Sequence, residues 1–253
     1  MKDKRILITG ASKGLGAVAA VALAERGARL VLIARSQDKL EHVRRSCKDS
    51  ERHLSIQVNL LQMKEIQPVV QKAKEFLGGI DVVLHAAGGG LGLKDEFLMH
   101  EDFLKLFTLN LGAAAEINRL VAPEMKERRA GNLVHVGSIA SSEGVGSVGY
   151  NTVKAALAAY VRSLGRELSR FNVIVTGILP GGFISPGNAM ARLQENNPEA
   201  YRRFIEERLP RRIMGDAKEL IPMLVILCSE DASMMGGCMV PIDAGEGVSY
   251  LTP

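Results

Sequence analysis

The segment Arg5–Gly16, RILITGASKGLG, decides the fold of this chain. Its first five residues, Arg5–Thr9, form a leucine-rich and β-branched run, and an alanine-rich stretch follows the glycines to about Arg26. A strand, a glycine-rich turn and a helix in this order favour nucleotide binding over a flexible loop. Gly10 permits the tight turn, and Gly14 and Gly16 let the backbone approach a pyrophosphate at the positive end of the helix.

The same alternation of short apolar runs and helical stretches continues along the chain. Further strands are predicted at Leu30–Ala34, Leu54–Val58, Val82–Leu84, Leu133–Val136, Val173–Ile178 and Met239–Ile242. Two long helices are expected at Glu101–Arg128 and Val148–Phe171, with Pro123 bending or ending the first. Apolar strands alternating with helices predict a Rossmann-like, doubly wound α/β fold with a parallel sheet, in one domain spanning residues 1–253.

Composition narrows the class of protein. The chain has 253 residues, 47% of them apolar, which is enough for one sizeable core. Its net charge of +4 is spread among interleaved acids and bases, without Trp or an aromatic and basic stripe, so no nucleic-acid partner is expected. No apolar run reaches the roughly 20 residues that span a bilayer, and we expect no signal peptide before the first strand. Three scattered cysteines without metal-ligand spacing predict a cytoplasmic protein with no metal site.

The end of the second predicted strand indicates which dinucleotide would bind. A carboxylate at this place would accept hydrogen bonds from the adenosine ribose of NAD, but the chain has Ala34, Arg35 and Ser36. Lys13 in the glycine turn adds a second cation. Two cations and a hydroxyl suit a 2′-phosphate, so we expect NADP(H) rather than NAD(H). The alternative is that both cations are ordinary surface charges.

A second segment, Gly137–Lys154, carries candidate chemistry. Tyr150 and Lys154 are four positions apart, so on a helix they share one face. An unperturbed tyrosine has a pKa of about 10, and a nearby ammonium would lower it towards the range useful for general acid–base catalysis. Ser138 could donate a hydrogen bond to a carbonyl oxygen during reduction. The alternative is a solvated pair on an exposed helix.

Taken together, these segments resemble the short-chain dehydrogenase/reductase family, in its compact single-domain form, over essentially the whole chain. TGASKGLG resembles the family's TGxxxGxG, and Ser138, Tyr150 and Lys154 resemble its Ser and YxxxK. Asn110 in LNLG resembles the active-site helix asparagine. The Pro180–Ser185 segment resembles the PGxxxT segment that contacts the nicotinamide carboxamide.

The resemblance implies a role for each matched position. Tyr150 would be the general acid in reduction or the base in oxidation, and Ser138 would polarise the carbonyl. Lys154 would lower the pKa of the tyrosine and bind the nicotinamide ribose, and Asn110 would hold a water in a proton relay through its helix's backbone. The implied cofactor contacts are Gly10, Ser12, Lys13, Gly14, Leu15, Gly16, Arg35, Ser36, Asn59, Leu60, Ala86, Ala87, Gly88, Tyr150, Lys154, Pro180, Gly181, Phe183 and Ser185.

Three positions depart from the family pattern. His85-Ala86-Ala87-Gly88 stands where the family has NNAG, and we expect His85 to be a hydrogen-bonded core histidine rather than a catalyst. Asn59-Leu60 replaces the usual Asp-Val near the adenine, and an asparagine can still donate and accept there. Ser185 replaces a threonine and keeps the hydroxyl.

The substrate is the least determined part of the prediction. Residues 182–212, named the lid segment here, resemble the mobile lid of the family and contain Arg192, Arg202, Arg203, Arg208, Arg211 and Arg212. These arginines could bind an anionic substrate or lie on the solvated face of an amphipathic helix. Arg128, Arg129 and Arg170 resemble positions with which ketoreductases dock an acidic carrier protein, although helix ends favour arginine in any case.

We therefore expect a ketone/secondary-alcohol oxidoreductase similar to 3-oxoacyl-carrier-protein reductases. A reductase of a sugar or specialised metabolite is the alternative, which the long lid segment favours somewhat. A dinucleotide-binding sensor or scaffold without turnover, or a structural interaction protein, is more remote. The resemblance also implies a homotetramer, or a homodimer, formed through the two long helices.

Overall fold

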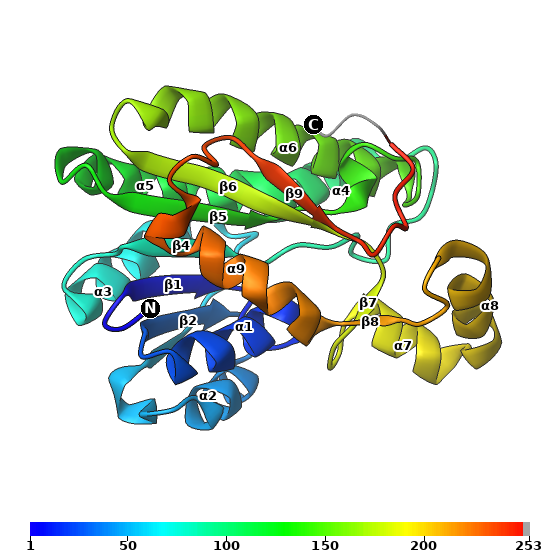
Figure 1. Cartoon of the computed structure of the whole chain (residues 1–253), viewed down its shortest axis with the longest axis horizontal. Coiled ribbons are helices and arrows are strands. Elements are labelled where there is room, and N and C mark those ends of the chain that lie inside the picture. The colour runs from blue at the N-terminus through cyan, green and yellow to red at the C-terminus, as the bar shows by residue number, and fades with distance from the viewer. Residues whose placement is uncertain (250–253) are drawn as a thin grey trace.

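Seven parallel strands form one sheet, in the order β3-β2-β1-β4-β5-β6-β9. The computed structural model describes residues 1–249, so the last four residues of the expected domain lie outside the described part. The strands are β1 Arg5–Thr9, β2 Arg29–Ala34, β3 Leu54–Gln57, β4 Val82–His85, β5 Gly131–Val136, β6 Val173–Pro180 and β9 Met239–Ile242 (Figure 1). Each predicted strand is confirmed within two residues. The predicted α/β doubly wound parallel sheet is therefore the fold of this chain.

The strands are apolar throughout because both faces of the sheet are covered. Side chains alternate along β1: Ile6 and Ile8 face one core cluster, and Leu7 faces the other. In β4, Val82 and Leu84 face the first cluster and Val83 the second. This period of two explains why a strand buried on both sides reads as a continuous hydrophobic run.

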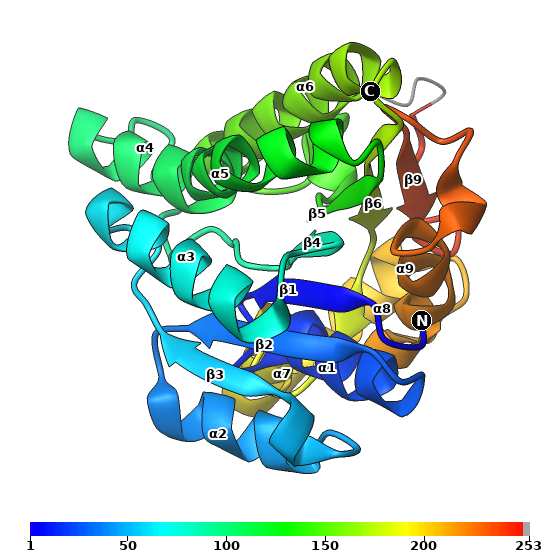
Figure 2. The same ribbon diagram turned by 90° about the vertical axis from the view of Figure 1, so that its left-hand side faces the viewer.

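Helices cover the two faces of the sheet as separate layers (Figure 2). The helices on one face are α1 Gly14–Glu25, α2 Gln37–Ser46 and α9 Ile221–Leu227. Those on the other face are α3 Ile66–Leu77, α5 Ala113–Glu127 and α6 Val148–Ser169. Short 3-10 turns lie at Ser50–Arg52, Met63–Glu65, Ile139–Ser141, Ala217–Leu220 and Glu230–Ala232. Among the described residues, no helix is both long and apolar enough to cross a membrane.

The expected single helix Glu101–Arg128 is interrupted. α4 His100–Phe107 leads into a π-helical turn at Thr108–Gly112, and α5 follows to Glu127. Of the two effects expected of Pro123, ending the helix was wrong, since Pro123 lies inside α5. A π-turn inserts an extra residue and redirects the side chains near it, and such turns are frequent at functional sites. Asn110 lies in this turn.

The lid segment lies beyond the carboxyl ends of the strands. It contains β7 Phe183–Ile184, α7 Ala189–Asn196 and α8 Pro198–Arg208, and β7 pairs in parallel with β8 Gly215–Asp216. α7 and α8 project from one end of the molecule (Figure 1). Asn188 caps α7 by accepting a hydrogen bond from the backbone N–H of Ala191 at 2.9 Å, and Asn197 caps α8 in the same way. The lid segment is thus a pair of capped helices.

Candidate active site

The glycine turn after β1 lies against the loop after β4. Gly10 has φ +67°, and a Cβ added to it would lie 2.7 Å from the backbone nitrogen of Ala87. That same nitrogen donates to the hydroxyl of Thr9 at 3.1 Å. Only glycine satisfies this left-handed backbone and this close approach. The predicted cofactor residues Gly10–Gly16 and Ala86–Gly88 are therefore brought together at the carboxyl edge of the sheet, where α/β proteins bind ligands.

The N-terminus of α1 meets the lid segment. The backbone N–H of Gly14 donates to the carbonyl of Pro186 at 3.1 Å. Ser185 is buried, and its hydroxyl has no hydrogen-bond partner within residues 1–249. A Cβ added to Gly14 would lie 3.7 Å from this hydroxyl oxygen. A helix N-terminus beside an unused buried hydroxyl is a donor set for an anionic group, so these residues fit the phosphate-bearing part of a dinucleotide.

The predicted adenosine end contains a small hollow. It has a volume of about 180 Å³ and is lined by Thr9, Leu60, Ala87 and Leu109 among others. Asn59 shapes the neighbouring turn, because its side-chain oxygen accepts from the N–H of Leu61 at 3.2 Å. Arg35 and Ser36 follow directly after β2, next to β3. Their order along the edge of the sheet agrees with an adenosine lying across β2, β1 and β4.

Helix α6 carries the candidate tyrosine and lysine on one face. Lys154 is 3% exposed, and its ammonium donates to the carbonyl of Val136 at 2.9 Å and lies 5.7 Å from the ring centre of Tyr150. Ser138 follows β5 and has a side-chain hydrogen bond to Tyr150. The three side chains predicted to act together are therefore adjacent.

Burial governs the charges in this cluster. It raises the pKa of Tyr150, and the hydrogen bond to Ser138 opposes the rise. Burial also lowers the pKa of Lys154 to about 8. The direction for Tyr150 is opposite to the expectation that Lys154 lowers this pKa. The reason is geometric, since the ammonium binds the Val136 carbonyl and the phenol is largely removed from water.

Asn110 anchors the loop after β4 to the π-turn. Its side-chain amide donates to the carbonyls of Gly89 at 3.0 Å and Leu106 at 2.9 Å, and its oxygen accepts from the N–H of Gly89 at 2.9 Å. A Cβ added to Gly88 would lie 2.8 Å from the Asn110 oxygen and 3.3 Å from the Lys154 nitrogen. Asn110 and Lys154 thus approach one another across Gly88, and the four predicted catalytic residues share one site.

A buried polar network lies under this site and was not predicted. His85 binds the Asn118 side chain at 2.8 Å, Asn118 also contacts the ring of His135 at 3.2 Å, and it donates to the Tyr160 hydroxyl at 3.1 Å. The two rings stack with centres 4.6 Å apart because His85 and His135 are register partners on β4 and β5. The expectation of a core histidine is confirmed for His85, although its Nδ1 has no partner within residues 1–249. The network could not be predicted from the sequence, because its residues lie on α5, β4, β5 and α6 and meet only in the folded structure.

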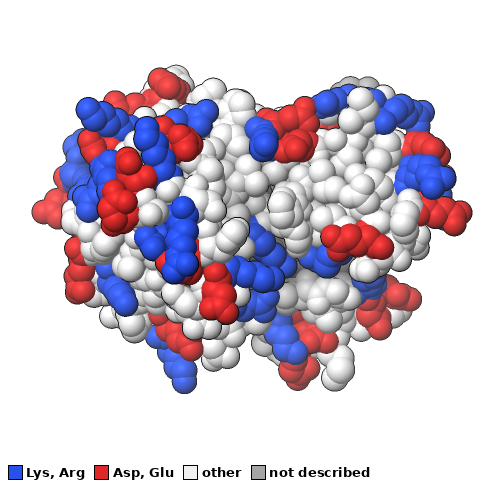
Figure 3. All heavy atoms as spheres, turned by 90° about the horizontal axis from the view of Figure 1, so that it is seen from below, with Lys and Arg blue, Asp and Glu red and all other residues white. Residues whose placement is uncertain are grey.

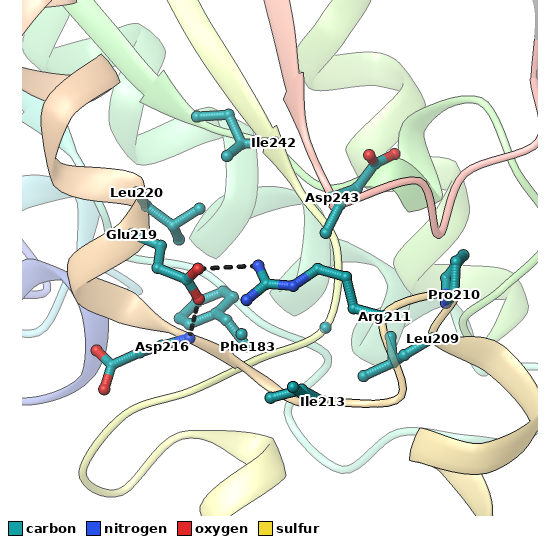
Figure 4. Close-up of a pocket in the computed structure, with 13 residues that line it drawn as sticks. Phe183, Leu209, Pro210, Arg211, Ile213, Asp216, Glu219, Leu220, Ile242 and Asp243 are labelled. Carbon is teal, nitrogen blue, oxygen red and sulfur yellow. Dashed lines mark hydrogen bonds and ion pairs between the residues drawn. The ribbon is translucent and has the colours of Figure 1, made fainter.

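Two lid arginines are already paired with carboxylates. Arg208 binds Glu246 at 2.9 Å, and the same buried carboxylate accepts from the N–H of Gly182, so it joins both ends of the lid segment. Arg211 binds Glu219 at 2.8 Å on the wall of a hollow of about 430 Å³ (Figure 4). These partners lie outside the lid helices, so neither an anionic substrate nor a solvated helix face is needed to account for Arg208 and Arg211.

The three arginines that resemble carrier-docking positions lie where α5 and α6 end, before β5 and β6 begin. That is the edge of the sheet opposite the candidate site. Arg128 donates to the carbonyl of Ala130 at 2.8 Å and lies 3.6 Å from Asp81. Arg129 donates to the Arg170 carbonyl at 3.1 Å, and Arg170 lies over the ring of Phe171. Each therefore has a structural contact of its own.

The open parallel sheet, its glycine turn and the site at its carboxyl edge define a dinucleotide-binding α/β oxidoreductase. Residues 4–196 match the family described as short chain dehydrogenase, and this chain belongs to that family. No cluster of three or more potential metal-ligating side chains is found among residues 1–249.

Individual relatives share the fold over nearly their whole length. Levodione reductase of Leifsonia aquatica is 30% identical to this chain, covering 98% of it and 96% of the relative. The 3-oxoacyl-(acyl-carrier-protein) reductase of Aquifex aeolicus is 28% identical, with 97% and 98% covered. A crystal structure of L-sorbose reductase from Gluconobacter frateurii, complexed with NADPH and L-sorbose, superposes with a TM-score of 0.88 at 27% identity, covering 98% of each chain. This chain is similar to several ketone reductases of different substrates.

Proposed function

We propose that this protein is an NADP(H)-dependent oxidoreductase that interconverts a ketone and a secondary alcohol. The observation that carries the proposal is the meeting of Ser138, Tyr150, Lys154 and Asn110 at the carboxyl edge of the sheet, beside the glycine turn. A binding protein without turnover has no need of a phenol, a hydroxyl and an ammonium converging on one point. The set therefore supports catalysis over the sensor alternative.

The residues divide the proton chemistry among them. The bound nicotinamide supplies the hydride, and the protein supplies position and charge. Ser138 donates a hydrogen bond to the carbonyl oxygen, and Tyr150 gives its proton to the oxygen as negative charge develops there. Because burial raises the pKa of Tyr150, the phenol is protonated and ready to act as an acid at neutral pH. The nearby Lys154 ammonium then stabilises the phenolate that remains.

Charge favours NADP(H) as the cofactor. Lys13 in the glycine turn and Arg35 after β2 lie where we propose that the adenosine binds, and no carboxylate stands at the end of β2. A solved relative at 27% identity has NADPH in its complex. Both observations support the 2′-phosphate as the group that this chain selects.

A 3-oxoacyl thioester remains the proposed substrate, in line with the relative from Aquifex aeolicus. A small ketone, such as a cyclic diketone or a keto sugar, is the second candidate. The specific observation that favours it is the engagement of Arg128 and Arg129 in contacts at the opposite edge of the sheet. Those contacts leave the carrier-docking argument without independent support.

We also propose a cytoplasmic homotetramer, or a homodimer, assembled through α4, α5 and α6. Large apolar side chains are exposed on α4 and just before it, with Phe97 87% and Met99 72% exposed and Leu104 and Phe107 about half exposed. Val148 at the start of α6 is also exposed. Such a patch is typical of an interface. Light scattering that gives the mass of one chain would contradict the assembly.

The direct test is oxidation of NADPH and NADH, followed by absorbance, with a panel of 3-oxoacyl thioesters, cyclic diketones, keto sugars and simple aryl ketones. We expect turnover of one substrate group with NADPH. Binding of NADPH without turnover of any member, and without oxidation of the matching alcohols, would favour the sensor. Binding of neither cofactor would overturn the proposed function.

A further inference from the structure

The lid segment touches the glycine turn where α7 begins. The carbonyl oxygen of Pro186 accepts a hydrogen bond from the backbone N–H of Gly14 at 3.1 Å. A Cβ added to Gly187 would lie 3.4 Å from Cδ of Lys13, so the lid backbone also lies against the lysine side chain. Asn188 ties the same stretch down through its cap on α7 and through its side-chain amide, which donates to the Phe183 carbonyl at 2.8 Å. A ligand held by Lys13 therefore lies next to the start of α7.

Arg192 lies in the first turn of α7 and turns back towards this contact. One guanidinium nitrogen of Arg192 donates to the Gly187 carbonyl at 2.6 Å, which places the guanidinium on the side of Gly187 and Lys13. The pKa of Lys13 is lowered, first by partial burial and then by the positive charges around it. Among these charges Arg192 has the largest effect, followed by Lys39 and Arg35. The lid arginine is thus a close positive neighbour of the turn lysine.

Lys13 and the three cations that act on it have no carboxylate partner in the described part of the chain. Arg192, Lys13, Arg35 and Lys39 come from the lid segment, the glycine turn, the end of β2 and the start of α2. Within residues 1–249 none of the four forms an ion pair with a carboxylate. By contrast, two other arginines of the lid segment, Arg208 and Arg211, form ion pairs with Glu246 and Glu219. Lys and Arg side chains also gather near the middle of the underside of the molecule (Figure 3).

Positive charges held near one another without ion-paired carboxylates suit a ligand of high negative charge. A phosphate monoester carries about two negative charges and three acceptor oxygens. The pyrophosphate is a poorer match, because its donors are the backbone N–H groups at the start of α1. Arg35 and Lys39 follow β2, where the adenosine ribose is expected.

We propose that Arg192 is a specificity-determining residue that binds the 2′-phosphate of NADP(H) from the lid segment, so that this phosphate holds the lid segment over the site. The inference rests on the proposed function and deepens it. NADH lacks the 2′-phosphate, so it would bind without engaging Arg192. Selection of the cofactor and ordering of the lid segment would then be one event.

The first test measures equilibrium dissociation constants for NADPH and NADH by calorimetry in the intact protein. Arg192→Ala should raise the dissociation constant of NADPH about tenfold, as expected for loss of one charge-assisted hydrogen bond. It should change the dissociation constant of NADH less than about twofold. Arg192→Lys should recover part of the loss, since an ammonium keeps the charge but not the planar fork. Arg203→Ala, an exposed arginine on α8, should leave both constants unchanged.

The second test reads the lid segment itself. A protease that cuts after glutamate can cleave α8 at the exposed Glu206 and Glu207. In the wild-type protein NADPH should slow this cleavage more than NADH does, at concentrations that saturate each. In Arg192→Ala the two cofactors should protect α8 equally.

Each remaining result has a definite meaning. An equal loss for NADPH and NADH would place Arg192 on the shared pyrophosphate and overturn the inference. Unchanged constants in Arg192→Ala would overturn it too, while NADPH binding by the wild-type protein would keep the proposed function standing. Failure of the wild-type protein to bind either cofactor would instead overturn the proposed function itself.

Discussion

The candidate site has two halves that are built in different ways. In the catalytic half, Lys154 and Asn110 are each 3% exposed and hydrogen-bonded to backbone groups. In the half that is proposed to face the cofactor phosphates, Lys13, Arg35 and Arg192 are exposed and without carboxylate partners among residues 1–249.

The difference agrees with what each half is proposed to do. Proton transfer needs atoms held to a fraction of an ångström, which burial and hydrogen bonds provide. Selection of a phosphate needs net positive charge in roughly the right place, which mobile surface side chains can supply. Substitutions in the buried half should therefore abolish activity or destabilise the fold, whereas substitutions in the exposed half should change only preference.

The largest effect is expected from the proposed acid. Tyr150→Phe removes only the phenol oxygen and should lower kcat about a thousandfold, within the range for loss of a general acid. Binding of NADPH should stay within about twofold, because the ring that lines the site remains. Stopped-flow rates and calorimetry on the same preparation give both values.

Tyr201→Phe is the matched control, since Tyr201 lies on α8 outside the cluster. Its activity should equal that of the wild-type protein. If Tyr150→Phe retained more than a tenth of the activity, the assignment of proton transfer to this residue would fail.

The buried histidines should make the fold sensitive to acid. Burial lowers the pKa of His135 to about 4 and that of His85 well below its usual value, with the neighbouring His135 adding to the effect on His85. Unfolded histidine titrates near pH 6.5, so between pH 6.5 and 4 the unfolded chain binds more protons than the folded one. The free energy of unfolding should therefore fall as the pH falls through this window, by about 3 kcal/mol from His135 alone.

Urea unfolding at pH 7 and pH 5 measures the part of this loss that falls between those two values, about 2 kcal/mol from His135. His135→Gln removes the titrating ring from its contacts with Asn118 and the Thr176 carbonyl, so its stability should depend less on pH than that of the wild-type protein. His100→Gln, at an exposed histidine, should keep the wild-type dependence. Identical pH profiles for all three proteins would contradict a role for the buried network.

A smaller effect should come from the carboxylate that joins the ends of the lid segment. The Glu246 side chain is 3% exposed and binds Arg208 and the N–H of Gly182. Glu246→Ala leaves both donors without this partner and should lower the free energy of unfolding by about 1–3 kcal/mol. It should also speed cleavage of α8 by a protease specific for glutamate.

Glu230→Ala provides the comparison, because Glu230 is 89% exposed in its ion pair with Lys4 and should contribute little. If the two variants were equally stable, Glu246 would not secure the lid segment.

The sequence predicted which residues lie together in the proposed catalytic half better than it predicted the contacts around the lid segment, for physical reasons. Buried parallel strands must be apolar runs, and residues four apart on α6 must share a face, so both are visible in the chain. Contacts through space are not: Glu246 meets Gly182 and Arg208 from distant parts of the sequence, and Asn118 joins two strands. The π-turn at Thr108–Gly112 has no characteristic residue pattern that would predict it. The rise in the pKa of Tyr150 comes from burial, which the sequence does not display.

The smallest effect concerns the charge that follows β2. Arg35→Ala should weaken the binding of NADPH about tenfold and that of NADH less than about twofold. The variant removes one cation that would contact the 2′-phosphate and leaves the rest of the site unchanged. Arg166→Ala, at an exposed arginine on α6, should change neither constant. Arg35→Asp goes further, since a carboxylate at this place can accept the ribose hydroxyls and repel a phosphate, so it should bind NADH more tightly than NADPH. Equal losses of affinity for both cofactors in Arg35→Ala would mean that the exposed half does not select between them. The two halves would then differ in burial, but the proposed difference in their functions would be wrong.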